Sequence, residues 1–349
     1  MRKSLIVLVI LVVVSSAFYF LRHRSNSTFT SPNSETLQQK STPLIKYAIE
    51  ALSKTNFNPS QISLGELVNS TPDFTSRIFY FYVDPSINSG QGRKVSGLIN
   101  IPNNGTDLPV IVMFRGYVDR EKYQTGVGTN HAGEVFAKNG FITLAPDFLG
   151  YGESDMPSEN PMEERFQTHT TALTLLASVK NLNAALSEAG VAARADPDRI
   201  AIWGHSNGGQ IALTILEITG KSYPTVLWAP VSKPFPYSIL YYTDDFDDHG
   251  RMLRKVVADF EKDYDSEGYS LASYFEKIKA PVQLHQGGAD EAVPLKWSDQ
   301  LYEQLKELDR DIQYFTYTGE DHNFAQGAWG QVVNRNIVFY QRQFGSNKE

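Results

Sequence analysis

Apolar segments of strand length recur along the chain from residue 77 onward, and the later ones alternate with helical patterns. The strand-like segments lie at 78–83, 95–101, 109–114, 141–145, 199–203, 224–229, 281–285 and 312–317, and the helical patterns at 131–138, 171–189, 210–219, 295–308 and 326–343. Strands that alternate with helices form a mostly parallel sheet with helices on both faces. The pattern therefore predicts an α/β fold for residues 77–349.

The alternation stops between residues 231 and 279, after the sixth predicted strand. This interval contains two prolines, an acidic run at 244–248 and many aromatic residues, namely Phe235, Tyr237, Tyr241, Tyr242 and Phe246. It is predicted to be a cap inserted into the α/β domain. The aromatic side chains either line a substrate pocket or form the core of the cap. The acidic run is expected to be a solvated loop, since it lacks the ordered spacing of an EF-hand calcium loop.

The N-terminus carries a different pattern. Residues 5–21 are apolar except for Ser15 and Ser16, and basic residues flank them on both sides. As a helix, this segment would span about 26 Å, just enough for a bilayer. Residues 1–24 are therefore expected to be a single-pass membrane anchor, with the following domain outside the cytoplasm. A cleaved signal peptide followed by secretion is the alternative, because small residues at 15–17 could precede the cut.

Polar residues and prolines dominate residues 25–43, which predicts a disordered tether. Apolar residues then recur at helical spacing between Leu44 and Leu52. We expect residues 44–76 to form an N-terminal extension whose short amphipathic helix packs on the domain.

Composition narrows the possible functions. The chain has 349 residues, a net charge of −7 and no cysteine. No basic block occurs after residue 24, so nucleic acid is not expected as a partner. The absence of cysteine excludes thiol nucleophiles and disulfides. The 7 histidines form no paired metal motif, and residues 126–131 lack the last glycine of a dinucleotide loop, so neither a metal nor a cofactor is expected.

A glycine-rich turn at residues 204–209 joins a predicted strand to a predicted helix. The sequence Gly-His-Ser-Asn-Gly-Gly places Ser206 at the centre of a G-x-S-x-G pattern. In such a turn the serine adopts a strained conformation, and the glycines allow the strand and helix to approach closely. Ser206 is therefore the candidate nucleophile of a strand-turn-helix elbow.

A serine nucleophile needs a base, and the base needs an acid that orients it. Asp290 follows the predicted strand 281–285, and His322 follows the last predicted strand. Because ligands of open α/β sheets bind at the carboxyl ends of the strands, these positions suit an acid and a base. Glu291 is the rival acid, but Asp290 better matches the turn.

The oxyanion of an acyl-transfer intermediate also needs hydrogen-bond donors. One is expected to be the backbone N–H of Asn207, and the second that of Tyr117, with Gly116 as the alternative. The neighbouring Arg115 is either structural or a ligand for a substrate carboxylate.

These segments resemble the α/β-hydrolase superfamily, and within it the prolyl oligopeptidase family and the dienelactone-hydrolase-like proteins. The resemblance covers roughly residues 77–345 and rests on the turn at 204–209, the segment at 146–154 and the loops that carry Asp290 and His322. It implies an α/β-hydrolase fold and cofactor-free serine hydrolysis of a peptide, amide or ester bond in a small molecule or short peptide.

Full-length prolyl oligopeptidases also contain a β-propeller, for which the 76 residues before Arg77 leave no room. The family also often has histidine or tyrosine where this chain has Arg115. A carboxylesterase or dienelactone-type activity therefore stays open beside a peptidase activity. A catalytically silent hydrolase fold that serves as a binding module is the third hypothesis. The sequence does not indicate an oligomeric state.

Overall fold

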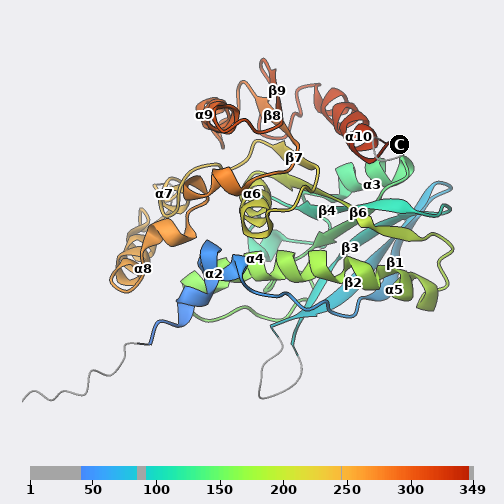
Figure 1. Ribbon diagram of the computed structural model, residues 1–349, viewed down its shortest axis with the longest axis horizontal. Coiled ribbons are helices and arrows are strands. Elements are labelled where there is room, and N and C mark those ends of the chain that lie inside the picture. Colours follow the sequence, from blue (N-terminus) through green and yellow to red (C-terminus); the bar gives the residue numbers. More distant parts are fainter. Residues whose placement is uncertain (1–40, 85–91, 245, 346–349) are drawn as a thin grey trace, which may run out of the picture. The chain divides into compact units, whose positions relative to one another are not determined.

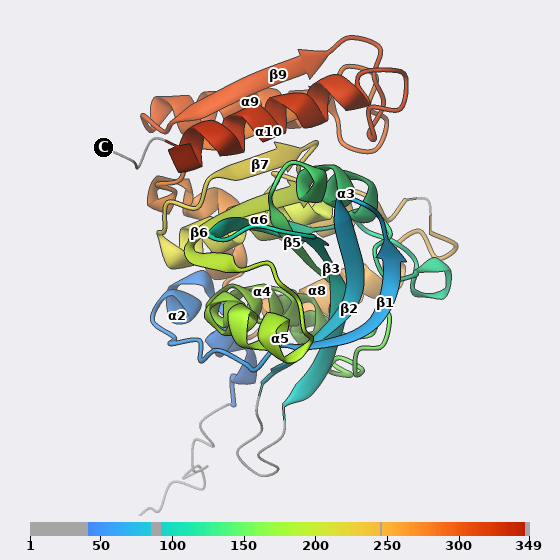
Figure 2. The same cartoon turned by 90° about the vertical axis from the view of Figure 1, so that its right-hand side faces the viewer.

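Every strand predicted from the sequence lies in one twisted sheet (Figures 1 and 2). In the described part of the chain the sheet has nine strands, in the order β1-β2-β3-β5-β4-β6-β7-β8-β9. They are β1 (Ser63–Ser70), β2 (Phe74–Val83), β3 (Arg93–Pro102), β4 (Leu108–Phe114), β5 (Ile142–Pro146), β6 (Ala195–His205), β7 (Thr225–Trp228), β8 (Val282–Gly287) and β9 (Ile312–Tyr317).

The computed structural model describes residues 41–84, 92–244 and 246–345. The predicted anchor or signal segment at 1–24 and nearly all of the predicted tether lie outside these ranges. None of the helices within them combines the length and apolar character that crossing a bilayer requires.

Strand direction divides the sheet into two parts. Strands β1, β2 and β3 are antiparallel to their neighbours, whereas β5, β4, β6, β7, β8 and β9 run parallel to one another. Every residue of β5, β7 and β8 is buried, as expected for parallel strands covered on both faces. The parallel strands therefore end at one common edge, which is where ligands bind in this class of sheet.

Helices cover both faces of the sheet, and the alternate side chains of β4 show which helices lie on each face. Val110, Val112 and Phe114 belong to one hydrophobic cluster, whereas Ile111 and Met113 belong to another, because successive side chains of a strand point to opposite faces. The first cluster includes residues of α4 (Pro161–Ser178), α5 (Leu182–Glu188), α6 (Asn207–Thr219) and α9 (Leu295–Glu307), and the second includes residues of α3 (Asn130–Lys138) and α10 (Trp329–Gly345). The predicted α/β-hydrolase architecture is confirmed.

The helix expected at 171–189 begins ten residues earlier and is interrupted. Helix α4 starts at Pro161 because the Asn160 side chain accepts hydrogen bonds from the backbone N–H groups of Met162 and Glu163. A 3-10 turn, Val179–Asn181, then separates α4 from α5. The apolar stripe does not reveal the first turns of α4, since these are largely polar.

The N-terminal extension contributes a strand to the sheet. Strand β1 pairs with β2, although most of its side chains are exposed and its sequence lacks an apolar run. The cap, expected after the sixth strand, therefore follows the seventh strand, β7. Before β1, a 3-10 turn (Pro43–Tyr47) and α2 (Ile49–Ser53) place Leu44 and Tyr47 in a cluster with residues of α4 and the cap.

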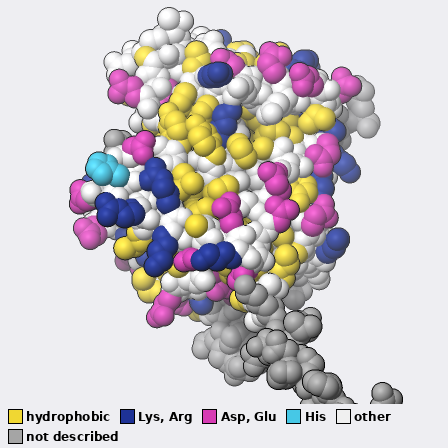
Figure 3. Space-filling view, turned by 90° about the vertical axis from the view of Figure 1, so that its left-hand side faces the viewer, with side chains coloured by type: hydrophobic (Ala, Val, Ile, Leu, Met, Phe, Trp, Pro, Cys, Tyr) yellow, Lys and Arg dark blue, Asp and Glu magenta, His cyan; other side chains and the backbone are white. Residues whose placement is uncertain are grey.

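The cap between β7 and β8 contains α7 (Tyr237–Leu240), α8 (Arg251–Glu261) and three 3-10 turns, Ser266–Tyr269, Leu271–Ser273 and Phe275–Lys277. Its aromatic residues form two groups. Phe235 packs against Phe166 and Phe260, whereas Tyr237, Tyr241 and Tyr242 gather around Trp297. On the surface that carries α7 and α8, hydrophobic side chains form a band (Figure 3).

In the acidic run, Asp244 pairs with Arg254, and the Asp248 carboxylate accepts hydrogen bonds from the backbone N–H groups of Gly250 and Met252 at the start of α8. The described residues contain no group of three or more histidine, aspartate or glutamate residues that could hold a metal ion.

Candidate active site

Ser206 lies between β6 and α6 in a strained conformation. Its φ is 57° and its ψ is −120°, which non-glycine residues rarely adopt. Hydrogen bonds hold it there, because the N–H of Ser206 donates to the carbonyl of Trp228 (2.9 Å) and the N–H of Val231 donates to the carbonyl of Ser206 (3.0 Å). The junction is the elbow geometry that the glycine pattern predicts.

The glycines of this turn are required by close backbone contacts. A Cβ atom at Gly208 would lie 1.9 Å from the carbonyl oxygen of Phe114, and one at Gly204 would lie 2.6 Å from the carbonyl oxygen of Gly208. Both distances are far shorter than a van der Waals contact. The start of α6 therefore packs directly against the end of β4.

Replacing Gly208 with alanine is expected to lower the free energy of unfolding by about 3 kcal/mol, the upper end of the usual range for overpacking. The added methyl group meets backbone atoms that cannot move without displacing the end of β4. Urea denaturation measures the change. Gly330→Ala is the matched control, since nothing beyond the adjacent residues and the backbone of its own helix, α10, lies within 4 Å of the added Cβ there. Equal stability of the two variants would contradict this account of the elbow.

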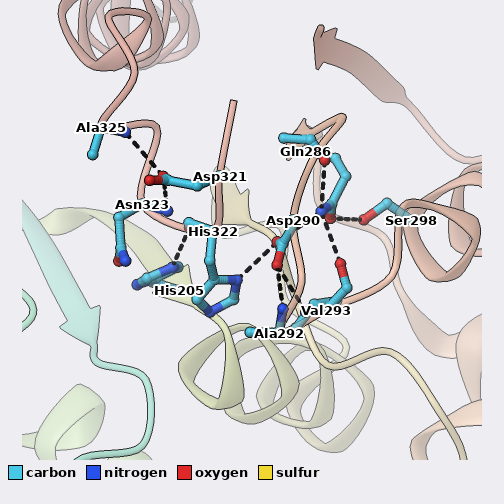
Figure 4. A network of polar contacts seen from close by, with 11 residues as sticks. His205, Gln286, Asp290, Ala292, Val293, Ser298, Asp321, His322, Asn323 and Ala325 are labelled. Carbon is cyan, nitrogen blue, oxygen red and sulfur yellow. Dashed lines mark hydrogen bonds and ion pairs between the residues drawn. The ribbon is translucent and has the colours of Figure 1, made fainter. Parts of the chain in front are cut away.

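The loops after β8 and β9 bring Asp290 and His322 together. The Nδ1 atom of His322 lies 2.8 Å from Oδ2 of Asp290 (Figure 4). The Asp290 side chain is fully buried and also accepts hydrogen bonds from Gln286 Nε2 and from the backbone N–H groups of Ala292 and Val293. Its neighbour Glu291, the rival acid, is exposed.

Asp290 is held in its ionised form. Burial acts to raise the pKa of this carboxyl, but the hydrogen bond and charge of His322, together with the donors of Val293 and Gln286, lower the pKa below its usual value. A carboxylate that accepts from Nδ1 of His322 fixes the proton of a neutral imidazole on that nitrogen. It therefore leaves Nε2 of His322 as the acceptor.

His205 connects this pair to the elbow. Its Nε2 lies 3.0 Å from the carbonyl oxygen of His322, and the two rings lie 4.6 Å apart between centroids (Figure 4). A carbonyl can only accept, so Nε2 of His205 carries the proton and donates. Burial, with a smaller contribution from His322, lowers the pKa of His205 to about 3, which keeps the ring neutral. The His322 loop thus contacts His205, the residue directly before Ser206.

The loop after β4 also packs against Ser206. A Cβ atom at Gly116 would lie 3.0 Å from Cβ of Ser206. The buried Arg115 guanidinium lies 4.4 Å and 4.1 Å from the ring centroids of Tyr123 and Tyr151, and it donates to the carbonyl oxygens of Gly116 (2.9 Å) and Asp147 (3.1 Å). These contacts favour the structural role for Arg115.

The contact with Arg115 also orients the next peptide unit. In a trans peptide the C=O and the following N–H point in opposite directions. Because Arg115 binds the carbonyl of Gly116, the N–H of Tyr117 points away from the guanidinium. No described residue accepts a hydrogen bond from this N–H. Asn207 is the first residue of α6, so its N–H has no intrahelical partner.

A cavity of about 290 Å³ adjoins the elbow. Asn207, Gln210, Ile211 and Thr214 of α6 form one wall, α4 forms another, and the cap and the segments around Arg115 and Phe148 close the rest. Phe235 and Ile239 line it from the cap, so some of the cap's apolar residues do face a pocket. The cavity extends to the largely exposed Tyr117.

The structure brings several of the predicted site residues together, but among the described residues no hydrogen bond joins Oγ of Ser206 to His322. Asp290 bonds His322, His322 contacts His205, and Gly116 and Asn207 flank Ser206. Sequence reasoning missed two residues that hold this arrangement, His205 and Gln286. His205 is the variable position of the glycine-serine pattern, and Gln286 lies within β8, so neither carries a local signal for its contact.

Comparison with known proteins shows which family the sequence is similar to. The sequence model of the prolyl oligopeptidase family matches residues 128–347. The uncharacterized peptidase YtmA of Bacillus subtilis (strain 168) is 29% identical over 267 residues, which are 74% of this chain and 90% of that protein. Dipeptidyl peptidase 4 of Felis catus is 30% identical over 149 residues, 42% of this chain and 19% of the relative.

Solved structures with the same fold include a puromycin-hydrolyzing peptidase of Mycobacterium tuberculosis, with a TM-score of 0.56 and 20% identity over 76% of this chain and 39% of that chain. An acetyl xylan esterase of Paenibacillus sp. R4 has a TM-score of 0.53 and 18% identity over 82% of this chain and 92% of that chain. At such identities these likenesses show the fold alone. The family match covers more than half of the chain, and the chain therefore belongs to the prolyl oligopeptidase family of hydrolases.

Proposed function

We propose that this hydrolase is a serine hydrolase that cleaves a peptide, amide or ester bond through an acyl-enzyme. Ser206 is the nucleophile, His322 the general base and Asp290 the acid that orients the imidazole. The observation that carries the proposal is the hydrogen bond between Asp290 and His322, held through His205 beside the strained Ser206.

The reaction has two halves. Oγ of Ser206 attacks the substrate carbonyl carbon while Nε2 of His322 takes the hydroxyl proton, and the carboxylate of Asp290 stabilises the imidazolium. As the tetrahedral intermediate collapses, His322 gives this proton to the leaving amine or alcohol. A water molecule then loses a proton to His322 and attacks the acyl carbon. The acid product leaves, and Ser206 regains its proton.

Two backbone N–H groups are proposed as donors to the oxyanion. Asn207 supplies one from the N-terminal end of α6, where the helix dipole also favours negative charge. Tyr117 supplies the second, supported by the orientation that Arg115 imposes on its peptide; Gly116 remains the alternative donor. Each donor is expected to contribute about 3 kcal/mol in the transition state.

Family membership favours a small or short peptide-like substrate, and YtmA and dipeptidyl peptidase 4 are named as peptidases. The esterase alternative also stands. Chemistry of this kind needs no cofactor. A non-catalytic binding role is disfavoured, because such a fold has no need of a buried carboxylate aligned on an imidazole.

Labelling with a fluorophosphonate tests the proposal. The probe is expected to add one phosphonyl group per chain, on the peptide that contains Ser206, as measured by intact mass and peptide mapping. Labelling should disappear in the His322→Gln protein, which lacks the base. An unlabelled native chain, or a label confined to other residues, would contradict the serine mechanism and favour the binding role.

Substrate panels then separate the two activities. Rates with 4-nitrophenyl esters of increasing acyl length are compared with rates for aminoacyl and dipeptidyl anilides. Preferential cleavage of the anilides assigns a peptidase, and cleavage of esters alone assigns an esterase.

A further inference from the structure

The cavity beside the elbow contains an arginine without an anionic partner. Arg165 lies on α4 and lines this cavity. Among the described residues, no group forms a hydrogen bond or ion pair with its guanidinium. The adjacent Glu164, the one carboxylate in the cavity lining, pairs instead with Arg120.

Apart from Glu164, the groups around Arg165 in the cavity lining carry no negative charge. His169, one turn further along α4, also lines the cavity, and burial together with the charge of Arg165 lowers its pKa to about 4. It is therefore neutral at pH 7. Arg115 adds a second guanidinium to the lining. The wall from α6 supplies the uncharged Gln210 and Thr214, and the cap supplies Phe235, Ile239, Leu253 and Tyr269.

Arg165 is partly buried, and a guanidinium that loses part of its hydration without gaining a partner is unfavourable. Removing a charge from water carries a free-energy cost that only a counter-ion or several hydrogen bonds offset. Burial is the main cause that lowers the pKa of Arg165, while Glu164 and Tyr151 act in the opposite direction. A planar guanidinium fits a carboxylate through two parallel hydrogen bonds. The group that Arg165 lacks is thus expected to be a carboxylate.

Much of the remaining lining is apolar, beside polar side chains such as Gln167, Gln210 and Thr214. Phe148 and Leu149 lie on the same cavity as Phe166, Phe235 and Ile239. An occupant that satisfies both features has an apolar stem and an anionic end. Because the cavity begins at Asn207, the neighbour of Ser206, this occupant is expected to be the part of the substrate attached to the reacting carbonyl.

We propose that Arg165 binds a carboxylate at the far end of the substrate's acyl group, so that the hydrolase prefers acyl groups with an apolar stem and a terminal carboxylate. The acyl half of a dicarboxylic acid monoester and a peptide residue with an acidic side chain both meet this description. The inference rests on the proposed function, since it assigns the acyl group of the substrate to this cavity.

Kinetics with matched esters test the inference. The 4-nitrophenyl monoesters of succinic, glutaric and adipic acid are compared with the neutral butyrate, valerate and hexanoate esters. The native protein is expected to show a kcat/KM about 10- to 100-fold higher for the best anionic ester than for its neutral match. In Arg165→Gln the ratio of the two kcat/KM values should fall to about one, and the change should appear mainly in KM for the anionic ester. Arg165→Lys should retain part of the preference.

A binding measurement separates this inference from the catalytic proposal. Calorimetry with glutarate alone, on the Ser206→Ala protein, should show saturable binding that the additional Arg165→Gln change removes. If the native protein shows no anionic preference, or if the ratio is the same in Arg165→Gln, the inference is wrong even when Ser206 reacts with the fluorophosphonate. If Ser206 does not react but glutarate still binds through Arg165, the catalytic proposal fails and the anion site stands.

Discussion

Ser206→Ala is expected to lower kcat for an activated ester by about 10⁵- to 10⁶-fold, the size of effect seen when a serine protease loses its nucleophile. The attacking oxygen is removed, and what remains is the contribution of the oxyanion donors and substrate binding. Steady-state kinetics with 4-nitrophenyl butyrate measure the change. The melting temperature should stay close to that of the native protein, because Oγ of Ser206 has no hydrogen-bond partner among the described residues and alanine keeps a Cβ in the same backbone conformation.

Ser187→Ala serves as the matched control. Ser187 is an exposed serine of α5, and its replacement should leave kcat and KM unchanged. A Ser206→Ala protein that hydrolyses the ester at the native rate would show that Ser206 is not the nucleophile. A protein that instead loses activity together with its cooperative unfolding transition would show a folding defect, which the melting curve reveals.

The elbow was predictable because its constraints are local. The strand before Ser206, the helix after it and the glycines between them all lie within about twenty residues of sequence. Asp290 and His322 were predictable for a different reason. Each follows a strand, and parallel strands end at one edge of the sheet, so β8 and β9, which are direct neighbours, deliver the two side chains to the same place.

The features that were not predictable depend on contacts between distant segments. Strand β1 is an exposed edge strand whose pairing with β2 leaves no apolar pattern in the sequence. The early start of α4 depends on the cap from Asn160, which a stripe of apolar residues does not show. Arg165 lies in these polar first turns, where an arginine is expected to face solvent. Only the packing of α4 against α6 and the cap places it in a cavity.

Asp290→Asn is expected to lower kcat by about 10⁴-fold, as the equivalent change does in serine proteases, with little change in KM. In the native protein, Oδ2 of Asp290 accepts from both His322 and Gln286, while Oδ1 accepts from the N–H groups of Ala292 and Val293. These two backbone donors keep the asparagine oxygen at the Oδ1 position. The Nδ2 group then faces His322, so Nδ1 of His322 must become the acceptor. The imidazole proton moves to Nε2, which can no longer take the proton of Ser206.

The same change should affect stability in a pH-dependent way. Because the pKa of Asp290 is lower in the folded protein than in the unfolded chain, the carboxylate stabilises the fold above about pH 3.9, the usual aspartate pKa. This contribution is lost as the pH falls through the folded-state pKa. Urea denaturation should therefore show Asp290→Asn to be less stable than the native protein at pH 7, with the difference narrowing in acid.

Glu291→Gln provides the control for both measurements, since it removes a carboxylate one residue away on an exposed side chain. It should change neither kcat nor the free energy of unfolding at pH 7 by a measurable amount. If Glu291→Gln reproduced the loss in kcat and Asp290→Asn did not, the acid assignment would pass to Glu291. The loop after β8 would then have to rearrange on substrate binding, because the hydrogen bond between Asp290 and His322 would have no part in orienting the base.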